Sequence, residues 1–190
     1  MDYLMEEKKE EFCSLLRSTK RDGIEQLISW LEKTDFFTAP ASTRYHGAEE
    51  GGLLIHTLTV YSALKAIKNG LINFSDLDDE SMIIVALLHD ICKADCYVVD
   101  YRNVKVDGEW TKQPFYKFEE KFCFGGHGSK SMYLASNFIK LSPEEASAIN
   151  AHMGAWDMTT YSNPSGVYDT NLLAFALHMA DEMATYVAKA

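Results

Sequence analysis

The chain has 190 residues, 47% of them hydrophobic and 24% charged, and a formal net charge of −10. This size and composition are typical of a folded soluble protein with one domain and a substantial hydrophobic core. The excess of acidic residues argues against broad binding of duplex nucleic acid or of an anionic membrane.

Helical periodicity dominates the sequence. In chain order, the predicted helices cover about residues 3–18, 23–34 and 52–68, the run SMIIVALLHDICK (81–93), about 128–139, a segment that begins at SPEE (142–145), and about 170–188. Two long segments between them, 35–52 and 154–169, are predicted loops because they are rich in Pro, Ser, Thr and Gly.

Potential capping residues mark several helix boundaries. Asp22 is a candidate N-cap of the second helix, and Ser75 or Asp76 of the fourth. The pair Asn69-Gly70 can end the third helix. In SPEE, a capping Ser is followed by Pro at the first helical position and Glu at the third, which predicts a capping box.

Residues 97–122 depart from the helical pattern. YRNVKV and EWTKQP flank Asp107-Gly108, which predicts a β-hairpin with a two-residue turn, inserted in a helical domain. The segment contains aromatic residues together with five basic and five acidic residues. We expect its aromatic side chains to pack on the domain; a stacking surface for a nucleobase or a single strand is the alternative, and a lid over the active site fits either.

The cysteines and the N-terminus indicate the compartment. Cys13, Cys92, Cys96 and Cys123 form no C-x-x-C pair, so a structural zinc ribbon is not expected. The N-terminus lacks an apolar secretory segment, and the longest apolar run, 82–88, is far shorter than the about 18 residues of a spanning helix. We therefore expect a cytoplasmic protein.

Ionisable side chains recur on the apolar stripes of several predicted helices. His56, His89 and His152 each continue such a stripe, as does Asp181 on the last helix. A single histidine in this position is usually a core residue with satisfied hydrogen bonds. Several helices that do this together, with Asp90 and Asp181 buried, indicate a divalent cation that supplies the counter-charge.

Five short stretches in order resemble one known family: GGLLIHTLTV, LLHDICK, GGHGSKS, INAHMGAW and LHMADEMAT. Their pattern, H…HD…H…H…D, resembles the HD-domain superfamily of metal-dependent phosphohydrolases, and most of all bacterial and phage HD hydrolases. It is also similar to the HD domain of certain 3′–5′ exoribonucleases. The resemblance covers about residues 36–188 and implies an all-α helical bundle, preceded by N-terminal helices over 1–35.

The resemblance also implies the metal ligands. His56, His89, Asp90 and Asp181 would form one site, and His127 and His152 would complete a second site with Asp90 as the bridge. One or two divalent ions, such as Mn, Fe, Mg, Ni or Co, are therefore expected as cofactors. In two positions the chain departs from its relatives: Cys92 stands where many carry Gly, and Ile55 where many carry Glu.

Four residues near this centre are candidates for substrate binding. Lys93 lies one turn after Asp90, where its ammonium could hold a phosphate oxygen; a role at the helix end is the alternative. Arg44, Tyr45 and His46 lie in the loop before the helix of His56. The resemblance places this loop at the mouth of the metal site, and Arg44 could bind phosphate there.

The resemblance implies hydrolysis of a phosphate ester by a metal-activated hydroxide, with Asp90 and Lys93 as catalytic residues. The expected substrate is a nucleotide or a short single-stranded oligonucleotide, and neither long duplexes nor membranes are expected partners. A di-iron oxygenase and a non-catalytic nucleotide sensor remain alternatives, since the same ligands could serve both. A homodimer is compatible with the sequence.

Overall fold

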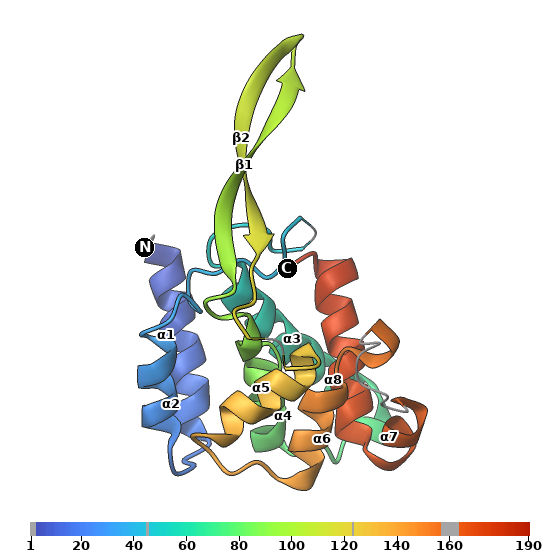
Figure 1. Cartoon of the computed structure of the whole chain (residues 1–190). Helices are drawn as coiled ribbons and strands as arrows, with labels where there is room; N and C mark the ends of the chain where they lie inside the picture. Colours follow the sequence, from blue (N-terminus) through green and yellow to red (C-terminus); the bar gives the residue numbers. More distant parts are fainter. Residues whose placement is uncertain (1–2, 45, 123, 157–163) are drawn as a thin grey trace.

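The computed structural model describes residues 3–44, 46–122, 124–156 and 164–190, and Figure 1 shows a helical body with one projecting hairpin. This confirms the predicted all-α fold with an inserted β-hairpin. Its α-helices and strands are α1 (Tyr3–Ser18), α2 (Ile24–Leu31), α3 (Gly52–Gly70), α4 (Asp79–Leu88), β1 (Tyr97–Val106), β2 (Glu109–Phe118), α5 (His127–Ser136), α6 (Pro143–Ala151), α7 (Pro164–Thr170) and α8 (Leu172–Glu182). The short 3₁₀ segments are η1 (Ile72–Phe74), η2 (Ile91–Lys93) and η3 (Gly154–Trp156), and a π-helical segment, η4 (Met183–Ala188), follows α8.

Helix α4 lies inside the body and is buried from its second turn to its end. Its residues from Met82 to Leu88 are all buried, as expected for a helix that is apolar on every side. It contacts α1, α3, α5, α6 and α8. The residues that directly follow α4 are therefore delivered into the interior of the body.

Two predicted boundaries were wrong in ways that affect the site. Helix α4 ends at Leu88 and does not continue to Lys93, because Asp90 adopts φ −116° and ψ 17° before η2 begins. Part of the predicted loop at 154–169 is helical, as η3 and α7; residues 157–163 of that loop lie outside the described residues.

The N-caps were predicted only in part. The capping box at Ser142 is confirmed, with reciprocal hydrogen bonds to Glu145. Asp78, and neither Ser75 nor Asp76, caps α4 by accepting from the Ser81 N–H. Gly23, in the left-handed region at φ 90°, occupies the N-cap of α2 in place of Asp22.

The hairpin is regular and extends away from the helices (Figure 1). Asp107 and Gly108 both have positive φ, 51° and 93°, as a two-residue hairpin turn of the type I′ class requires. The expectation that the aromatic side chains pack on the domain was wrong for Tyr101 and Trp110, which are 62% and 71% exposed. Only the foot of the hairpin packs against the body.

A buried ion pair ties three segments together below the hairpin. Arg21, after α1, donates to both carboxylate oxygens of Glu145 at 2.7 and 2.6 Å. Glu145 is fully buried on α6 and also accepts from the Ser81 hydroxyl of α4 at 2.7 Å. Burial would raise the pKa of Glu145, but hydrogen bonds from Arg21, the Ser142 backbone and Ser81, together with the Arg21 charge, hold the pKa below its ordinary value.

We expect Glu145→Gln to lower the free energy of unfolding at pH 7 by about 3 kcal/mol, because it removes the buried one of the two carboxylates that pair with Arg21, the other being Glu80. The lowered pKa means that this stability is present above the ordinary glutamate pKa of about 4.3 and is lost as the pH falls through the lower value of the folded state. Urea titrations at pH 7 and at acidic pH should therefore show the difference between the variant and the wild type shrinking in acid.

The matched control is Glu25→Gln, which removes an exposed carboxylate paired with Arg17 at 2.8 Å. No measurable change is expected there, since exposed ion pairs contribute little. Equal effects of the two substitutions would contradict the role given to the buried pair.

Candidate metal centre

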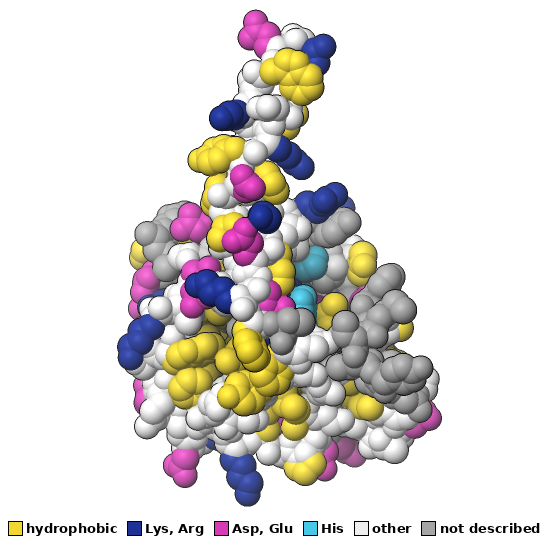
Figure 2. Space-filling view, viewed as in Figure 1, with side chains coloured by type: hydrophobic (Ala, Val, Ile, Leu, Met, Phe, Trp, Pro, Cys, Tyr) yellow, Lys and Arg dark blue, Asp and Glu magenta, His cyan; other side chains and the backbone are white. Residues whose placement is uncertain are grey.

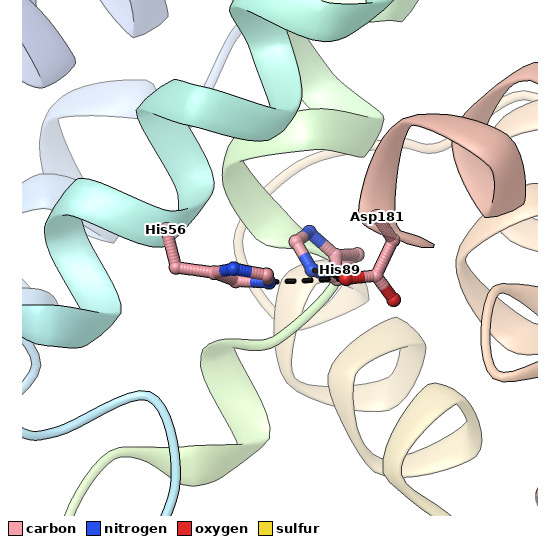
Figure 3. A group of neighbouring side chains, drawn as sticks. All are labelled: His56, His89 and Asp181. Atoms are coloured by element: carbon pink, nitrogen blue, oxygen red, sulfur yellow. Dashed lines mark ion pairs between the residues drawn. The ribbon is translucent and has the colours of Figure 1, made fainter. Parts of the chain in front are cut away.

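Three side chains from separate elements converge in the interior: His56 of α3, His89 after α4 and Asp181 of α8 (Figure 3). The Nε2 atom of His56 lies 3.1 Å from Asp181 Oδ1, and Nε2 of His89 lies 4.0 Å from the same oxygen. One ligand atom from each residue falls within 4.8 Å of the others. This spacing fits three ligands of one ion.

Asp90 lies between this group and a second one. Its Oδ2 atom is 3.4 Å from His89 Nε2 and 3.8 Å from His56 Nε2. Its Oδ1 atom points the other way, 3.6 Å from Nε2 of His152. The two oxygens of one buried carboxylate thus face two groups of histidines, which is the arrangement a bridging ligand needs.

The histidine rings are oriented by contacts between their Nδ1 atoms and backbone carbonyl oxygens. Nδ1 of His89 donates to the Ala86 carbonyl at 2.8 Å, and Nδ1 of His152 donates to the Ile149 carbonyl at 2.7 Å. Nδ1 of His56 lies 3.1 Å from the Ala190 carbonyl. Because a carbonyl can only accept, Nδ1 has the hydrogen in each ring and Nε2 keeps its lone pair, as a metal ligand requires.

His89 and His152 occupy equivalent places, each directly after the last residue of a helix. Their Nδ1 atoms bond carbonyls of the last helical turn, which otherwise have no partner within the helix. The C-termini of α4 and α6 therefore both point at the centre, and each contributes a partial negative charge of about half a unit. That field favours a cation.

His127 is the first residue of α5, and its ring lies near Asp90. Gly125, at φ 94°, provides the turn that precedes it. Ligand atoms of His127, Asp90 and Cys92 lie within 4.8 Å of one another. Cys92 is a candidate ligand that the sequence did not indicate; the one hint was its place beside Asp90, where relatives often have Gly. Burial raises the pKa of its thiol to about 12.

The buried polar atoms of this centre fit a bound cation. Those without a hydrogen-bond partner include His127 Nδ1 and four atoms that lie together: the Nε2 atoms of His56, His89 and His152, and Asp90 Oδ1. Buried polar atoms without a partner are costly, and a divalent ion would satisfy all four. Burial would raise the pKa of Asp181, but its contacts with His56 and His89 lower it below the ordinary value, so the carboxylate is anionic and ready to bind an ion.

Lys93 is buried beside Asp90. Its Nζ atom lies 2.7 Å from Asp90 Oδ2 and donates to the Ala41 carbonyl at 2.9 Å. Burial would lower the pKa of Lys93, but the Asp90 carboxylate outweighs it and raises the pKa. Lys93 thus directly neutralises the carboxylate that the two groups of histidines share.

Two of the three predicted substrate residues in the loop before α3, Arg44 and His46, belong to the described part of the chain. His46 is half-buried, its ring centroid is 5.0 Å from that of His56, and burial lowers its pKa to about 4. Arg44 is exposed and lines a pocket of about 540 Å³ at the foot of the hairpin. Tyr45 lies outside the described residues.

A second layer supports the end of α6. His178 of α8 donates from Nδ1 to the His152 carbonyl at 2.7 Å and stacks on Tyr168 of α7, with ring centroids 5.4 Å apart. The Tyr168 hydroxyl donates to the Ala151 carbonyl at 3.2 Å. Helices α7 and α8 therefore fix the turn from which the His152 side chain points at Asp90.

The fold and the site define a helical domain with a histidine- and aspartate-rich centre suited to divalent ions. The HD domain family matches residues 53–186, and the chain belongs to the HD-domain superfamily of metal-dependent phosphohydrolases. Comparisons with curated proteins and with solved structures found no match. None of the helices in the described part of the chain combines the length and apolar character needed to cross a membrane.

We expect Mn²⁺ to stabilise the protein and Asp90→Asn to abolish most of this effect, because the amide cannot provide a charged oxygen to each group. An ion at a hundredfold excess over its Kd raises the free energy of unfolding by about 2.7 kcal/mol. Thermal unfolding with and without Mn²⁺, together with the metal content of the purified protein, measures this. Asp100→Asn, an exposed change on β1, is the control; equal stabilisation of both variants would remove Asp90 from the ligands.

Proposed function

We propose that this chain is a metal-dependent hydrolase of phosphate esters that acts on a nucleotide or a short single-stranded oligonucleotide. Its membership of the HD superfamily supports the hydrolase class. The observation that supports the proposal most is the position of Asp90, one buried carboxylate between two groups of histidine nitrogens without hydrogen bonds. Structural histidines would not leave these nitrogens without partners.

The proposed ligands are those that the family resemblance implies, and all six belong to the three overlapping groups of candidate ligands around Asp90. His56, His89 and Asp181 would hold one ion, and His127 and His152 would hold a second, with Asp90 between them. Divalent ions bound there would polarise the phosphate and lower the pKa of a water molecule. The chain's own contribution is to fix the ligand atoms in place and to exclude bulk water, since the centre lies in the buried interior.

Cationic side chains near the centre would receive the substrate's phosphate. Lys93 uses two of its three N–H donors, on Asp90 and on the Ala41 carbonyl. The third could stabilise charge that develops on a phosphate oxygen. The guanidinium of Arg44, which lies near the foot of the hairpin, could form a bidentate interaction with a phosphate.

We expect Mn²⁺-dependent release of p-nitrophenol from bis-p-nitrophenyl phosphate or from p-nitrophenyl phosphate, and a fall in kcat/KM by a factor of about 10³ in Asp90→Asn. That factor is at the upper end of what one lost electrostatic contact costs. The ratio of the two rates would show whether a diester or a monoester is preferred. Asp100→Asn should retain the wild-type rate.

Two results of these experiments would contradict the proposed hydrolase function. Bound iron with an oxygen-dependent absorption spectrum, and no ester cleavage, would favour a di-iron oxygenase. Tight nucleotide binding without turnover, in protein that contains metal, would favour a sensor.

Lys93→Met distinguishes a substrate role of the lysine from a positioning role. If Lys93 contacts the phosphate, the variant should keep its Mn²⁺ affinity and lose about 10²-fold in kcat, as for one lost oxyanion donor. If it only holds Asp90, the Mn²⁺ affinity should change as well. Titration with Mn²⁺ followed by steady-state kinetics separates the two, and Lys93→Arg, which keeps the charge, should recover part of the rate.

A further inference from the structure

The two faces of the hairpin differ in chemistry, and the strand register assigns each residue to one of them. Cross-strand partners lie on the same face, and successive residues alternate between faces. Tyr97 pairs with Phe118, and Val106 pairs with Glu109. One face therefore contains the odd-numbered residues of 97–105 and the even-numbered residues of 110–118. We call it the aromatic face; the other residues of the two strands form the opposite face.

The aromatic face combines aromatic rings with positive charge. Its rings are Tyr97, Tyr101, Trp110, Tyr116 and Phe118. Two lysines and no Asp or Glu lie on it. This composition is unexpected in a chain with a net charge of −10, and it matches the basic, aromatic surfaces that bind single-stranded nucleic acid.

The opposite face lacks both properties. Its two basic residues, Arg102 and Lys117, are offset by Asp100 and Glu109. Its one ring, Phe115, is covered by the Arg102 guanidinium 5.5 Å from the ring centroid. Exposed rings and an excess of positive charge therefore occur together on the aromatic face and not on the opposite face.

The outer rings of the aromatic face are exposed to solvent. Tyr101 is 62% and Trp110 71% exposed, and Figure 2 shows the hairpin standing clear of the body with hydrophobic and basic side chains along it. An isolated two-stranded hairpin is only marginally stable in water. A ligand that covers these rings would remove apolar surface from water and stabilise the strands.

The foot of the aromatic face adjoins the metal centre on both strands. The Tyr97 hydroxyl of β1 donates to the Ala41 carbonyl at 3.1 Å, the same oxygen that accepts from Lys93. The Phe118 ring of β2 lies 5.9 Å from the His127 ring. Figure 2 shows histidine side chains in the hollow beside the foot of the hairpin. A strand lying on this face would end at the candidate ligands.

A pocket of about 540 Å³ lies between this foot and the loop before α3. Arg44 lines it together with Val99 and Tyr116 of the aromatic face and with Arg102 and Phe115 of the opposite face. Its volume is in the range of sites that bind nucleotide-sized ligands, and a guanidinium pairs well with phosphate. The pocket offers a place for one nucleotide between the hairpin and the loop before α3.

We propose that the aromatic face binds single-stranded nucleic acid and directs its end to the metal centre, so that the substrate is an oligonucleotide and not a free mononucleotide. This inference rests on the hydrolase function proposed above. The face is ~27 Å long from Tyr97 to Lys105 at 3.4 Å per residue, long enough to contact several nucleotides. A second copy of this acidic chain fits it less well, because lysines and Asn103 interrupt its outer half.

The test compares variants of the two faces. Tyr101→Ala/Trp110→Ala removes two rings from the aromatic face, and Val98→Ala/Val106→Ala removes two exposed side chains from the opposite face. Fluorescence anisotropy with a 12-nucleotide phosphorothioate oligothymidylate and Mn²⁺ measures binding. The first variant should bind at least about fivefold more weakly for each ring, while the second should bind as the wild type does.

Two lysines of β2 provide a test variant and a matched control for the electrostatic part of binding. Lys112 lies on the aromatic face and Lys117 on the opposite face. We expect Lys112→Gln to reduce the slope of log affinity against log salt by about 0.7, the value for one phosphate contact to a single strand. Lys117→Gln should leave the slope unchanged.

Turnover of a small ester separates this inference from the proposed hydrolase function. The aromatic-face variant should lose kcat/KM on the 12-nucleotide strand and keep it on bis-p-nitrophenyl phosphate. Face-selective binding without any hydrolysis would support the binding face and overturn only the hydrolase. Oligonucleotide binding that is absent, or equal in both hairpin variants, would overturn the inference; a dimer that dissociates only in Tyr101→Ala/Trp110→Ala, with no oligonucleotide binding, would identify the face as an interface between copies.

Discussion

The structure depends on the burial of one carboxylate. Asp90 is 2% exposed, and an isolated charge in that position would cost several kcal/mol. Lys93 supplies a positive charge at 2.7 Å, and three histidine Nε2 atoms lie within 3.8 Å of its oxygens. The elements that surround it are arranged so that this charge is compensated, and a divalent ion would complete the compensation on the side of His152.

The ends of helices, more than their faces, position this centre. If α4 continued through Asp90, His89 and Asp90 would point about 100° apart from a regular helix. Instead the helix ends at Leu88, and His89 returns its Nδ1 hydrogen to the Ala86 carbonyl. His152 does the same at the end of α6. Each of these histidines thus satisfies a carbonyl at the end of a helix with Nδ1 and directs Nε2 toward the candidate metal centre. Substitution of either histidine should therefore disturb both the local structure and the binding of an ion.

The sequence could predict which side chains come together at the candidate metal centre. It could not predict the local backbone structure that positions them. The stripe positions of His56 and Asp181 and the order of the histidine motifs brought six residues into one expected cluster, and the structure places ligand atoms of all six in overlapping groups. The end of α4 was missed because the apolar run has no Gly or Pro there, and only tertiary contacts stop it. Cys92 was not predicted as a candidate ligand, because the sequence does not show that its Sγ atom approaches His127.

The net charge of the hairpin segment does not show how its charged residues are distributed between the two faces. Residues 97–122 contain equal numbers of acidic and basic residues. Summed over both faces of the hairpin, their charge argued against a surface that binds nucleic acid. A period of two residues and the pairing of Tyr97 with Phe118 place Asp100 and Glu109 on one side and Lys105 and Lys112 on the other. The same alternation brings the exposed rings beside the lysines. An acidic protein can therefore present a local surface for a polyanion, because binding responds to the field of one face within a screening length of about 10 Å and not to the net charge of the chain.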